Sequence, residues 1–340
     1  NPTPQPQHIL DATPPPIPIP THQPTPIPTF DPTSSRKSGS TSNPTSHSVG
    51  KDDLHRHITA APTAEPTPSG SPQPIPIPTE NPQESFYDHL TTILSQQLPP
   101  NSFADPSSPQ SQALEWLAED NFSISERLTD NRLLQRFALA TFFYSFGHGA
   151  TLEQTDECGW RGGDWYFLRC SSEHEVAYFA LVPNKQTSGT IPPEFSVLSA
   201  LVRLRLHFNS LDGSIPSSLS KLTALEHLDL VSNSFTGTIP SQLSTLTALR
   251  YLDIQDNAFR GTIPSQLSTL TALTWLSLSR NQLTGTVPHQ LSTLSTLDGL
   301  FLDQNRLAGT FPSSLCGIRN IYVDRTEITC ASSGCCGGNI

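Results

Sequence analysis

The chain has 340 residues, with 30 Asp and Glu against 19 Lys and Arg and a net charge of −11 at neutral pH. Residues 1–175 carry 20 acidic and nine basic side chains, whereas residues 176–340 carry ten of each. No basic stripe is present, which excludes nucleic acid as a partner. The longest apolar run, Phe137–Phe146, is far shorter than the roughly 20 residues of a membrane span. Methionine is absent even at residue 1, which predicts a processed or clipped product and leaves open whether a signal peptide or membrane anchor preceded Asn1.

Residues 1–110 are predicted to form a disordered Pro/Thr/Ser-rich stalk. They hold 25 of the 33 prolines, many alternating with Thr or Ile, as in Pro14–Thr29 and Pro72–Thr79. Such segments favour extended polyproline structure and cannot bury a core. The Ser and Thr residues beside proline are acceptors for O-glycans in the secretory pathway, and a plain spacer is the alternative. Helical spacing of apolar residues predicts one short helix that docks onto the folded part: Phe86, Leu90, Ile93 and Leu94.

Residues 111–175 are predicted to form a helical cap. Leu114, Trp116 and Leu117 indicate one helix, and a second begins at Thr129 or Asp130. The apolar face of the second helix consists of Leu133, Leu134, Phe137, Leu139, Ala140 and Phe143. The sequence Asn121-Phe-Ser123 is an acceptor for N-glycosylation at Asn121, in an expected cap loop.

From about Leu201 to Pro312 the sequence repeats every 24 residues as L-x-x-L-x-L-x-x-N-x-L-x-G-x-I-P, after a less regular entering coil that starts at Val176. A fixed period of this size indicates a solenoid. Leu204 and Leu206 are two residues apart, so both face the core while Arg205 faces outward. One coil cannot bury its own leucines, so neighbouring coils must cover them. An Asn ends each strand and is expected to bond backbone groups of two coils: Asn209, Asn233, Asn257, Asn281 and Asn305.

The L-x-x-N-x-L-x-G-x-I-P form resembles the plant-type leucine-rich repeat of receptor-like proteins, receptor-kinase ectodomains and polygalacturonase inhibitors, a repeat that diatoms and other protists also have. The resemblance implies an α/β fold, in which residues 176–315 form a right-handed solenoid of 24-residue coils with a parallel sheet on its concave face. Cys158-Gly-Trp160-Arg-Gly162 and the following Cys170 resemble the cysteine pair that closes the amino-terminal cap of such solenoids. The resemblance also implies a cell-surface or extracellular location, a protein, peptide or cell-wall glycan partner, a membrane co-receptor and no cofactor.

Residues 316–340 are predicted to form a carboxy-terminal cap that contains Cys316, Cys330, Cys335 and Cys336. Four cysteines allow three pairings. A bond between the adjacent Cys335 and Cys336 would be strained, so Cys316 and Cys330 are each expected to pair with one of that doublet. A zinc site is the alternative, and the absence of C-x-x-C and of a well-spaced His argues against it. Disulfides indicate an oxidising compartment.

The outward positions of the strands are the candidate ligand-binding surface. The column before each middle leucine reads Tyr178, Arg203, His227, Tyr251, Trp275 and Gly299, and the column after it reads Ala180, Arg205, Asp229, Asp253, Ser277 and Phe301. Aromatic residues and Arg provide much of the binding energy at interfaces, whereas a merely solvated face would need neither. We therefore expect recognition or adhesion, with inhibition of a secreted hydrolase as the alternative. The expected ligand contacts are Arg203, Arg205, His227, Asp229, Tyr251, Asp253, Trp275 and Phe301.

Two further features of the repeats point to other functions. Asp229 and Asp253 form a neighbouring carboxylate pair of the kind that glycoside hydrolysis needs, but on an open surface without a pocket, so the chain is predicted to be a non-enzyme with no metal site. A hydroxyl column is the second feature, and regular Thr arrays order surface water, which makes an ice-binding or structural wall protein a further alternative. Thr also simply suits a second short strand. The column consists of Thr190, Ser214, Thr238, Thr262, Thr286 and Thr310.

Overall fold

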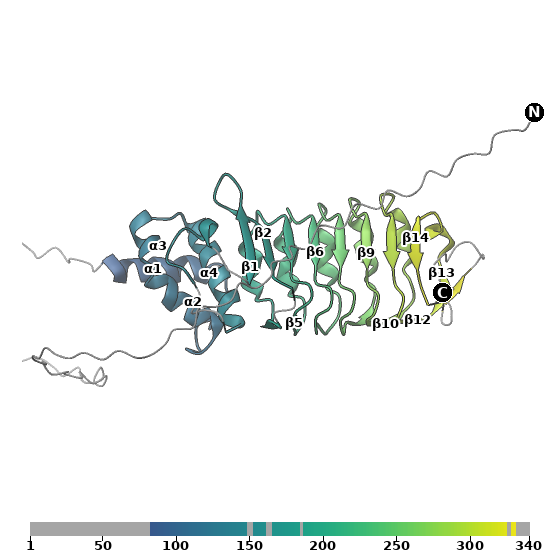
Figure 1. Ribbon diagram of the computed structural model, residues 1–340, viewed down its shortest axis with the longest axis horizontal. Coiled ribbons are helices and arrows are strands. Elements are labelled where there is room, and N and C mark those ends of the chain that lie inside the picture. Colours follow the sequence, from purple (N-terminus) through teal and green to yellow (C-terminus); the bar gives the residue numbers. More distant parts are fainter. Residues whose placement is uncertain (1–81, 148–151, 161–164, 184–185, 325–327, 331–340) are drawn as a thin grey trace, which may run out of the picture. The chain divides into compact units, whose positions relative to one another are not determined.

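The computed structural model describes residues 82–147, 152–160, 165–183, 186–324 and 328–330. The chain divides into two units, residues 1–74 and residues 75–340. All the described elements belong to the second unit, which begins with helices and continues as stacked coils (Figure 1). The predicted stalk up to residue 81 lies outside the described residues, so its polyproline character stays a prediction.

Four helices form the amino-terminal cap: α1 (Pro82–Ser95), α2 (Pro109–Ala118), α3 (Asn121–Glu126) and α4 (Asp130–Ser145). The two helices predicted within 111–175 are confirmed as α2 and α4, and Thr129 is the N-cap of α4. The short helix predicted from Phe86, Leu90, Ile93 and Leu94 is confirmed as α1, so the folded part begins before residue 111. The helical spacing of Leu90, Ile93 and Leu94 prevails there over the proline-rich composition, since all three side chains are buried in one core with α2 and α4.

The main sheet has eight strands in the order β1-β2-β4-β6-β7-β9-β11-β14. Every neighbouring pair is parallel except β1 with β2, which the repeat pattern did not predict. Each of the six strands after β2 comes from a successive coil, which confirms the predicted parallel sheet (Figure 1). The strands are β1 (Tyr166–Cys170), β2 (Val176–Leu181), β4 (Arg203–Arg205), β6 (His227–Asp229), β7 (Tyr251–Asp253), β9 (Trp275–Ser277), β11 (Gly299–Phe301) and β14 (Asn320–Tyr322).

Short 3-10 helices close the coils opposite the main sheet, and Leu219 and Leu222, three residues apart at one of them, are fully buried. They are η3 (Pro193–Val197), η4 (Ser217–Lys221), η5 (Ser241–Thr245), η6 (Ser265–Thr269), η7 (His289–Thr293) and η8 (Ser313–Leu315), and η2 (Glu157–Gly159) lies in the cap. Between sheet and helices, two-to-four-residue strands pair along one flank: β3 (Ser188–Gly189), β5 (Ser210–Leu211), β8 (Arg260–Thr262), β10 (Gln282–Gly285), β12 (Arg306–Leu307), β13 (Gly309–Phe311) and β15 (Ile328–Cys330).

The core is a column of side chains in which each coil covers the next. The middle leucines of successive strands are directly paired and fully buried: Leu204, Leu228, Leu252, Leu276 and Leu300. Asn257 shows how the coils are joined, because its Nδ2 donates to the carbonyl oxygens of Leu230 in the preceding coil (3.0 Å) and Ile254 in its own (3.1 Å). Its Oδ1 accepts from the backbone N–H of Phe235 (3.0 Å). This confirms the predicted structural role of the Asn column.

Leu252→Ala tests the inward orientation of the middle leucines. The side chain is fully buried in the centre of the solenoid. We expect the free energy of unfolding to fall by about 2–5 kcal/mol because the truncation leaves a cavity. Chemical denaturation of the full chain measures this, with the exposed Gln266→Ala on η6 as the control. Equal stability of the two variants would contradict the packing.

Candidate ligand-binding site

The outward side chains of the main sheet form two straight rows. The first row is Tyr178, Arg203, His227, Tyr251, Trp275, Gly299 and Asn320, and the second is Ala180, Arg205, Asp229, Asp253, Ser277, Phe301 and Tyr322. The register of six consecutive parallel pairs therefore brings all eight predicted ligand contacts onto one face. We call this surface the outer face.

Five rings on the outer face form a continuous stack, which we call the aromatic ladder: His227, Tyr251, Trp275, Phe301 and Tyr322. Successive ring centroids are 5.3, 5.9, 4.3 and 5.0 Å apart, and the interplanar angles are 13°, 12°, 32° and 15°. Offset stacking of this kind contributes about 0.5–1.5 kcal/mol per pair beyond burial. The ladder is thus a preorganised surface, because its rings are held by one another before any ligand arrives.

Tyr322 is a ladder residue that the sequence prediction missed. It lies beside Phe301 on the cap strand β14 and is 36% exposed. The 24-residue period does not predict this position, because Tyr322 follows its paired residue Phe301 at a sequence distance three residues shorter than one period. The only sequence signal is the Ile321-Tyr322-Val323 strand pattern after the last coil.

Gly299 allows the ladder to cross from the first row to the second. A Cβ at this position would lie 2.8 Å from Cε2 of Phe301 and 3.0 Å from Cε3 of Trp275. Those distances are below van der Waals contact, so any side chain at residue 299 would displace the rings. Without a side chain there, the Trp275 ring on the first row meets the Phe301 ring on the second, with centroids 4.3 Å apart.

The ladder is only partly exposed to solvent. Tyr251 and Trp275 are partly buried, because each lies between two other rings, and Asp253 is only 4% exposed. The hydroxyl of Tyr251 donates to Oδ2 of Asp253 at 2.9 Å. Burial raises the pKa of Asp253, and burial together with the Asp253 charge raises the pKa of Tyr251. The carboxylate of Asp253 is therefore poorly solvated.

The end of the outer face nearest the cap is basic. Arg203 is exposed, Arg205 is partly buried, and Nε of Arg205 has no hydrogen-bond partner among the described residues. Burial, Arg203 and Arg205 lower the pKa of His227, in that order. Asp229 does not neutralise the arginines as an ion pair, since its Oδ2 lies 2.8 Å from Nδ1 of His207. Guanidinium donors therefore remain available beside the ladder.

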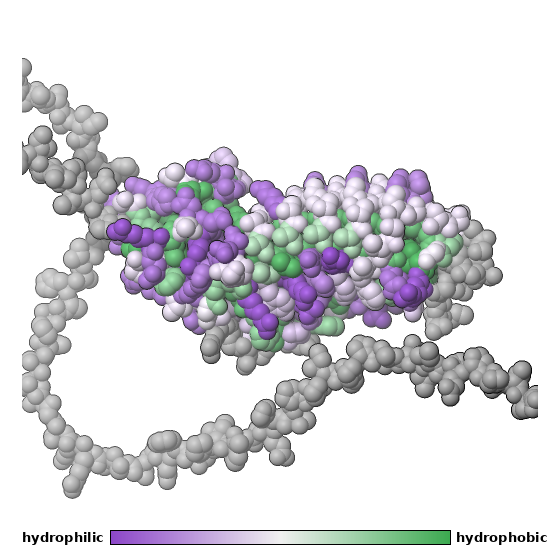
Figure 2. Space-filling model, turned by 90° about the horizontal axis from the view of Figure 1, so that it is seen from above, coloured by the Kyte–Doolittle hydropathy of each residue, from purple (hydrophilic) through white to green (hydrophobic). Residues whose placement is uncertain are grey.

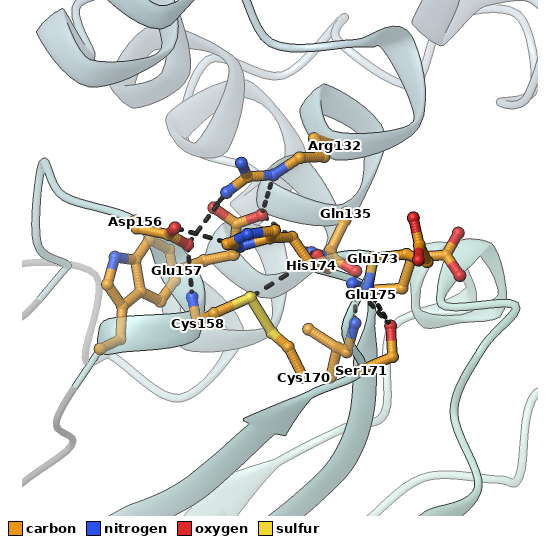
Figure 3. The surroundings of a disulfide bond; sticks show 12 residues. Arg132, Gln135, Asp156, Glu157, Cys158, Cys170, Ser171, Glu173, His174 and Glu175 are labelled. Carbon is orange, nitrogen blue, oxygen red and sulfur yellow. Dashed lines mark hydrogen bonds and ion pairs between the residues drawn. A yellow bond between two sulfur atoms is a disulfide. The ribbon is translucent and has the colours of Figure 1, made fainter.

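The cap holds the strand that begins the sheet. The disulfide Cys158–Cys170 ties η2 to the end of β1, which confirms the pairing that the family resemblance implied (Figure 3). Trp165 and Phe167, at and beside the start of β1, are 40% and 57% exposed. Because Phe167 is paired with Ala180, it lies on the outer face and extends that face toward the cap.

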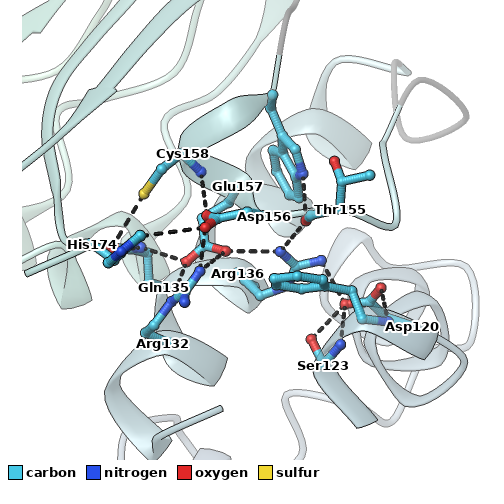
Figure 4. A network of polar contacts seen from close by, with 12 residues as sticks. Asp120, Ser123, Arg132, Gln135, Arg136, Thr155, Asp156, Glu157, Cys158 and His174 are labelled. Atoms are coloured by element: carbon cyan, nitrogen blue, oxygen red, sulfur yellow. Dashed lines mark hydrogen bonds and ion pairs between the residues drawn. The ribbon is translucent and has the colours of Figure 1, made fainter. Parts of the chain in front are cut away.

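A buried ion network that the sequence prediction missed lies between α4 and the segment that carries Cys158 (Figure 4). Arg136 is fully buried, and its guanidinium lies 2.5 Å from Asp120 and 2.8 Å from Glu157, both also fully buried. The same guanidinium lies over the rings of Trp116 and Trp160, at 5.3 and 5.1 Å. A buried charge costs several kcal/mol unless it is fully paired, and here both acids and rings surround it.

The two caps also contain a predicted glycosylation site, the predicted cysteine pairs and one group of possible metal ligands. Asn121 is exposed, but it is the first residue of α3 instead of a loop residue, and its glycosylation stays a prediction. Cys316 and Cys330 are each disulfide-bonded, whereas Cys335 and Cys336 lie outside the described residues. Asp156, Cys158 and His174 come close enough together for a metal, but the Cys158 sulfur is in the disulfide and is no thiolate ligand.

The hydroxyl column lies on the flank of the solenoid, away from the outer face. All six of its residues are exposed, and three of them line a shallow groove across successive coils: Thr262, Thr286 and Thr310. The hydroxyl column and the outer face are therefore two separate candidate surfaces. In the view of Figure 2, strongly hydrophilic residues gather over the helical end, while much of the solenoid surface is only weakly polar.

A family model described as leucine rich repeat matches residues 199–259 and 247–307. The match covers the coils that carry the Asn column and most of the ladder. Residues 199–307 therefore carry leucine-rich repeats. No curated protein matches its sequence.

Several solved structures are similar to this leucine-rich-repeat chain. A plant ice-binding protein is 28% identical with a TM-score of 0.50, over 57% of this chain and 63% of that one. A TDR receptor is 32% identical with a TM-score of 0.40, over 42% of this chain and 25% of that one. The ectodomain of the receptor kinase SOBIR1 from Arabidopsis thaliana is 28% identical with a TM-score of 0.43, over 51% of this chain and 94% of that one. The chain thus spans less than two thirds of the first two proteins.

Asp253→Asn tests the cost of the buried carboxylate. The pKa of Asp253 is raised in the folded protein, so the protonated carboxyl favours folding and the ionised one opposes it. Its contribution to the free energy of unfolding is therefore fully present below the unfolded pKa of about 3.9 and is lost as pH rises through the folded pKa. Asn does not titrate and keeps an acceptor for Tyr251. We therefore expect the Tm difference, variant minus wild type, to increase from pH 4 to pH 7 in thermal melts.

The control for Asp253→Asn is Asp256→Asn, which removes one exposed carboxylate from the same coil. A Tm difference that is independent of pH, or equal in the two variants, would show that burial of Asp253 carries no such cost.

Proposed function

We propose that this protein is a non-enzymatic recognition module whose outer face binds a peptide or protein ligand. The aromatic ladder carries the proposal: five rings on five neighbouring strands, preorganised by stacking and beside two arginines. Aromatic and Arg side chains dominate binding energy at interfaces, and rigid rings lose little entropy on binding. A sheet that only had to be soluble would not need four large aromatic rings stacked on neighbouring strands.

Catalysis by the carboxylate pair of the outer face is the weaker interpretation. Asp229 is engaged by His207, and Asp253 by the Tyr251 hydroxyl and the backbone N–H of Gln255. Carboxylates that are occupied in this way hold a structure together instead of facing a substrate. Inhibition of a secreted hydrolase remains within the proposal, since the hydrolase would then be the protein ligand.

Extracellular function is supported by the cysteines. Cys158, Cys170, Cys316 and Cys330 are all disulfide-bonded, and such bonds persist in oxidising compartments. None of the described helices is long and apolar enough to span a bilayer. A co-receptor or a tether upstream of Asn1 belongs to this proposal as a prediction.

The Tyr251→Ala/Trp275→Ala double variant of the full chain tests the outer face. We expect wild-type protein to bind a member of a secreted-protein and peptide array and the variant to lose that binding, because the centre of the ladder is gone. A matched control is Gln242→Ala/Gln266→Ala, at equivalent exposed positions on η5 and η6. Binding that survives in the ladder variant while its Tm is unchanged would refute the outer-face site.

Ice binding is a second candidate, favoured by a separate observation. The hydroxyl column is exposed at six successive coils, and a plant ice-binding protein is among the structures that the chain resembles. Hydroxyls repeated at the spacing of strands, about 4.8 Å, can order a layer of water.

Thermal hysteresis of the purified full chain decides this second candidate. We expect hysteresis that falls in Thr262→Lys/Thr286→Lys and persists in the ladder variant, because the hydroxyl column and the ladder lie on different surfaces. No hysteresis and no reshaping of ice crystals by the wild type would end the idea.

A further inference from the structure

We propose that the aromatic ladder binds a proline-rich segment of a partner molecule in the polyproline II conformation. This inference rests on the proposed function and specifies its ligand. Proline-rich peptides dock onto aromatic-lined surfaces because their backbone is already extended and loses little entropy. Four observations on the ladder favour such a ligand over a sugar or a helix.

The first observation is that the central rings have no free face. Tyr251 lies between His227 and Trp275, at interplanar angles of 13° and 12°. Phe301 likewise lies between Trp275 and Tyr322. Stacking of a sugar ring needs an open aromatic face, and these rings present only their edges outward. A row of edges forms a ridged apolar surface, which suits the small apolar side chains of a peptide.

The second observation is a donor without an acceptor. Nε1 of Trp275, in the middle of the ladder, has no hydrogen-bond partner among the described residues. An indole N–H only donates, so it needs a carbonyl or a hydroxyl. A helix uses its carbonyls internally, whereas every carbonyl of a polyproline II segment is free. Because Nε1 is buried in the free protein, this bond forms only if the Trp275 ring shifts when the peptide binds.

The third observation is the spacing of the rings along the solenoid. The ladder takes one ring from each of the successive strands β6, β7, β9, β11 and β14. Two strand spacings are about 9.6 Å. One turn of polyproline II, three residues at about 3.1 Å each, is about 9.3 Å. A ligand lying across the strands therefore repeats its contacts at every second coil.

The fourth observation is charge. None of the five ladder side chains is a carboxylate or a guanidinium, and the two arginines of the outer face lie only at the His227 end of the ladder. An uncharged ligand matches the rings beyond that basic end. The Pro14–Thr29 sequence of this chain is one example of such chemistry, because it has no Lys, Arg, Asp or Glu and places Pro14, Ile17 and Pro20 on one face of a three-residue turn.

A synthetic peptide with the sequence Pro14–Thr29 is the probe. It is titrated into the full chain and followed by isothermal calorimetry and by the shift in Trp fluorescence. We expect saturable binding that weakens about tenfold or more in Tyr251→Ala/Trp275→Ala, as for the loss of hot-spot residues. A control peptide with Pro16→Ala, Pro18→Ala and Pro20→Ala should bind more weakly, and cellopentaose should not bind.

Gly299→Ala separates ladder geometry from ladder composition. The added Cβ would displace the rings of Trp275 and Phe301 without removing either. We expect weaker peptide binding and a changed near-UV circular dichroism spectrum at unchanged far-UV spectrum. Gly317→Ala is the matched control, since a Cβ there meets no atom within 4 Å. A merely structural role of Gly299 would change Tm without changing the affinity for the peptide.

Each outcome decides between the two proposals. No binding of the peptide to the wild type at millimolar concentration, or binding unaffected by the double variant, overturns the polyproline ligand. If the double variant still loses an array ligand of another class, the recognition function stands and only the ligand class is wrong. Self-association of the full chain that the free peptide reverses would support the inference, with a second copy as the source of the segment.

Discussion

A single coil of this chain cannot bury its own leucines, and the rest of the structure depends on that constraint. Leu252 is fully buried only because Leu228 and Leu276 lie directly beside it on neighbouring strands. The stack brings backbone groups into the core as well, and these need partners. The Asn column supplies them, since one Asn257 side chain bonds carbonyls of two coils and an N–H of the preceding one. Leucine packing and Asn bonding together fix the strand register.

An open stack has two ends, and each end needs a cover of different chemistry. At the amino-terminal end α4 places Phe142 and Phe143 in the same core as the first coils. The helix is held in turn by Arg136, which is buried between two acids and two tryptophans. Removing one partner from such a network leaves an uncompensated charge, so its members are expected to act as a unit. At the other end β13 and β15 pair, and Cys316 and Cys330 are disulfide-bonded.

The same strand register that buries the leucines aligns the outward residues. Pairing of five successive strands is what turns separate aromatic residues into the aromatic ladder. The ladder changes from the first row to the second beside Gly299, the one residue in these two rows without a side chain. A repeat protein can therefore vary its ligand by changing outward residues, while the inward ones keep the coils in place. The separate hydroxyl column illustrates this freedom, because the same coils present a second regular surface on their flank.

The sequence by itself determined the coils, the inward and outward alternation and the two outward rows, because a 24-residue period fixes which residues lie side by side. It also located α2, α4 and the Cys158–Cys170 pair. The sequence also predicted the helix α1 and its docking, but only the tertiary structure showed which helices bury Leu90 and Leu94, since those helices are distant from them in sequence. The tertiary structure alone brought Tyr322 into the ladder, because the cap strand breaks the period, and it alone joined Arg136 to Asp120 and Glu157. Those contacts link positions without any repeat, and the burial that makes them strong exists only once the chain has packed.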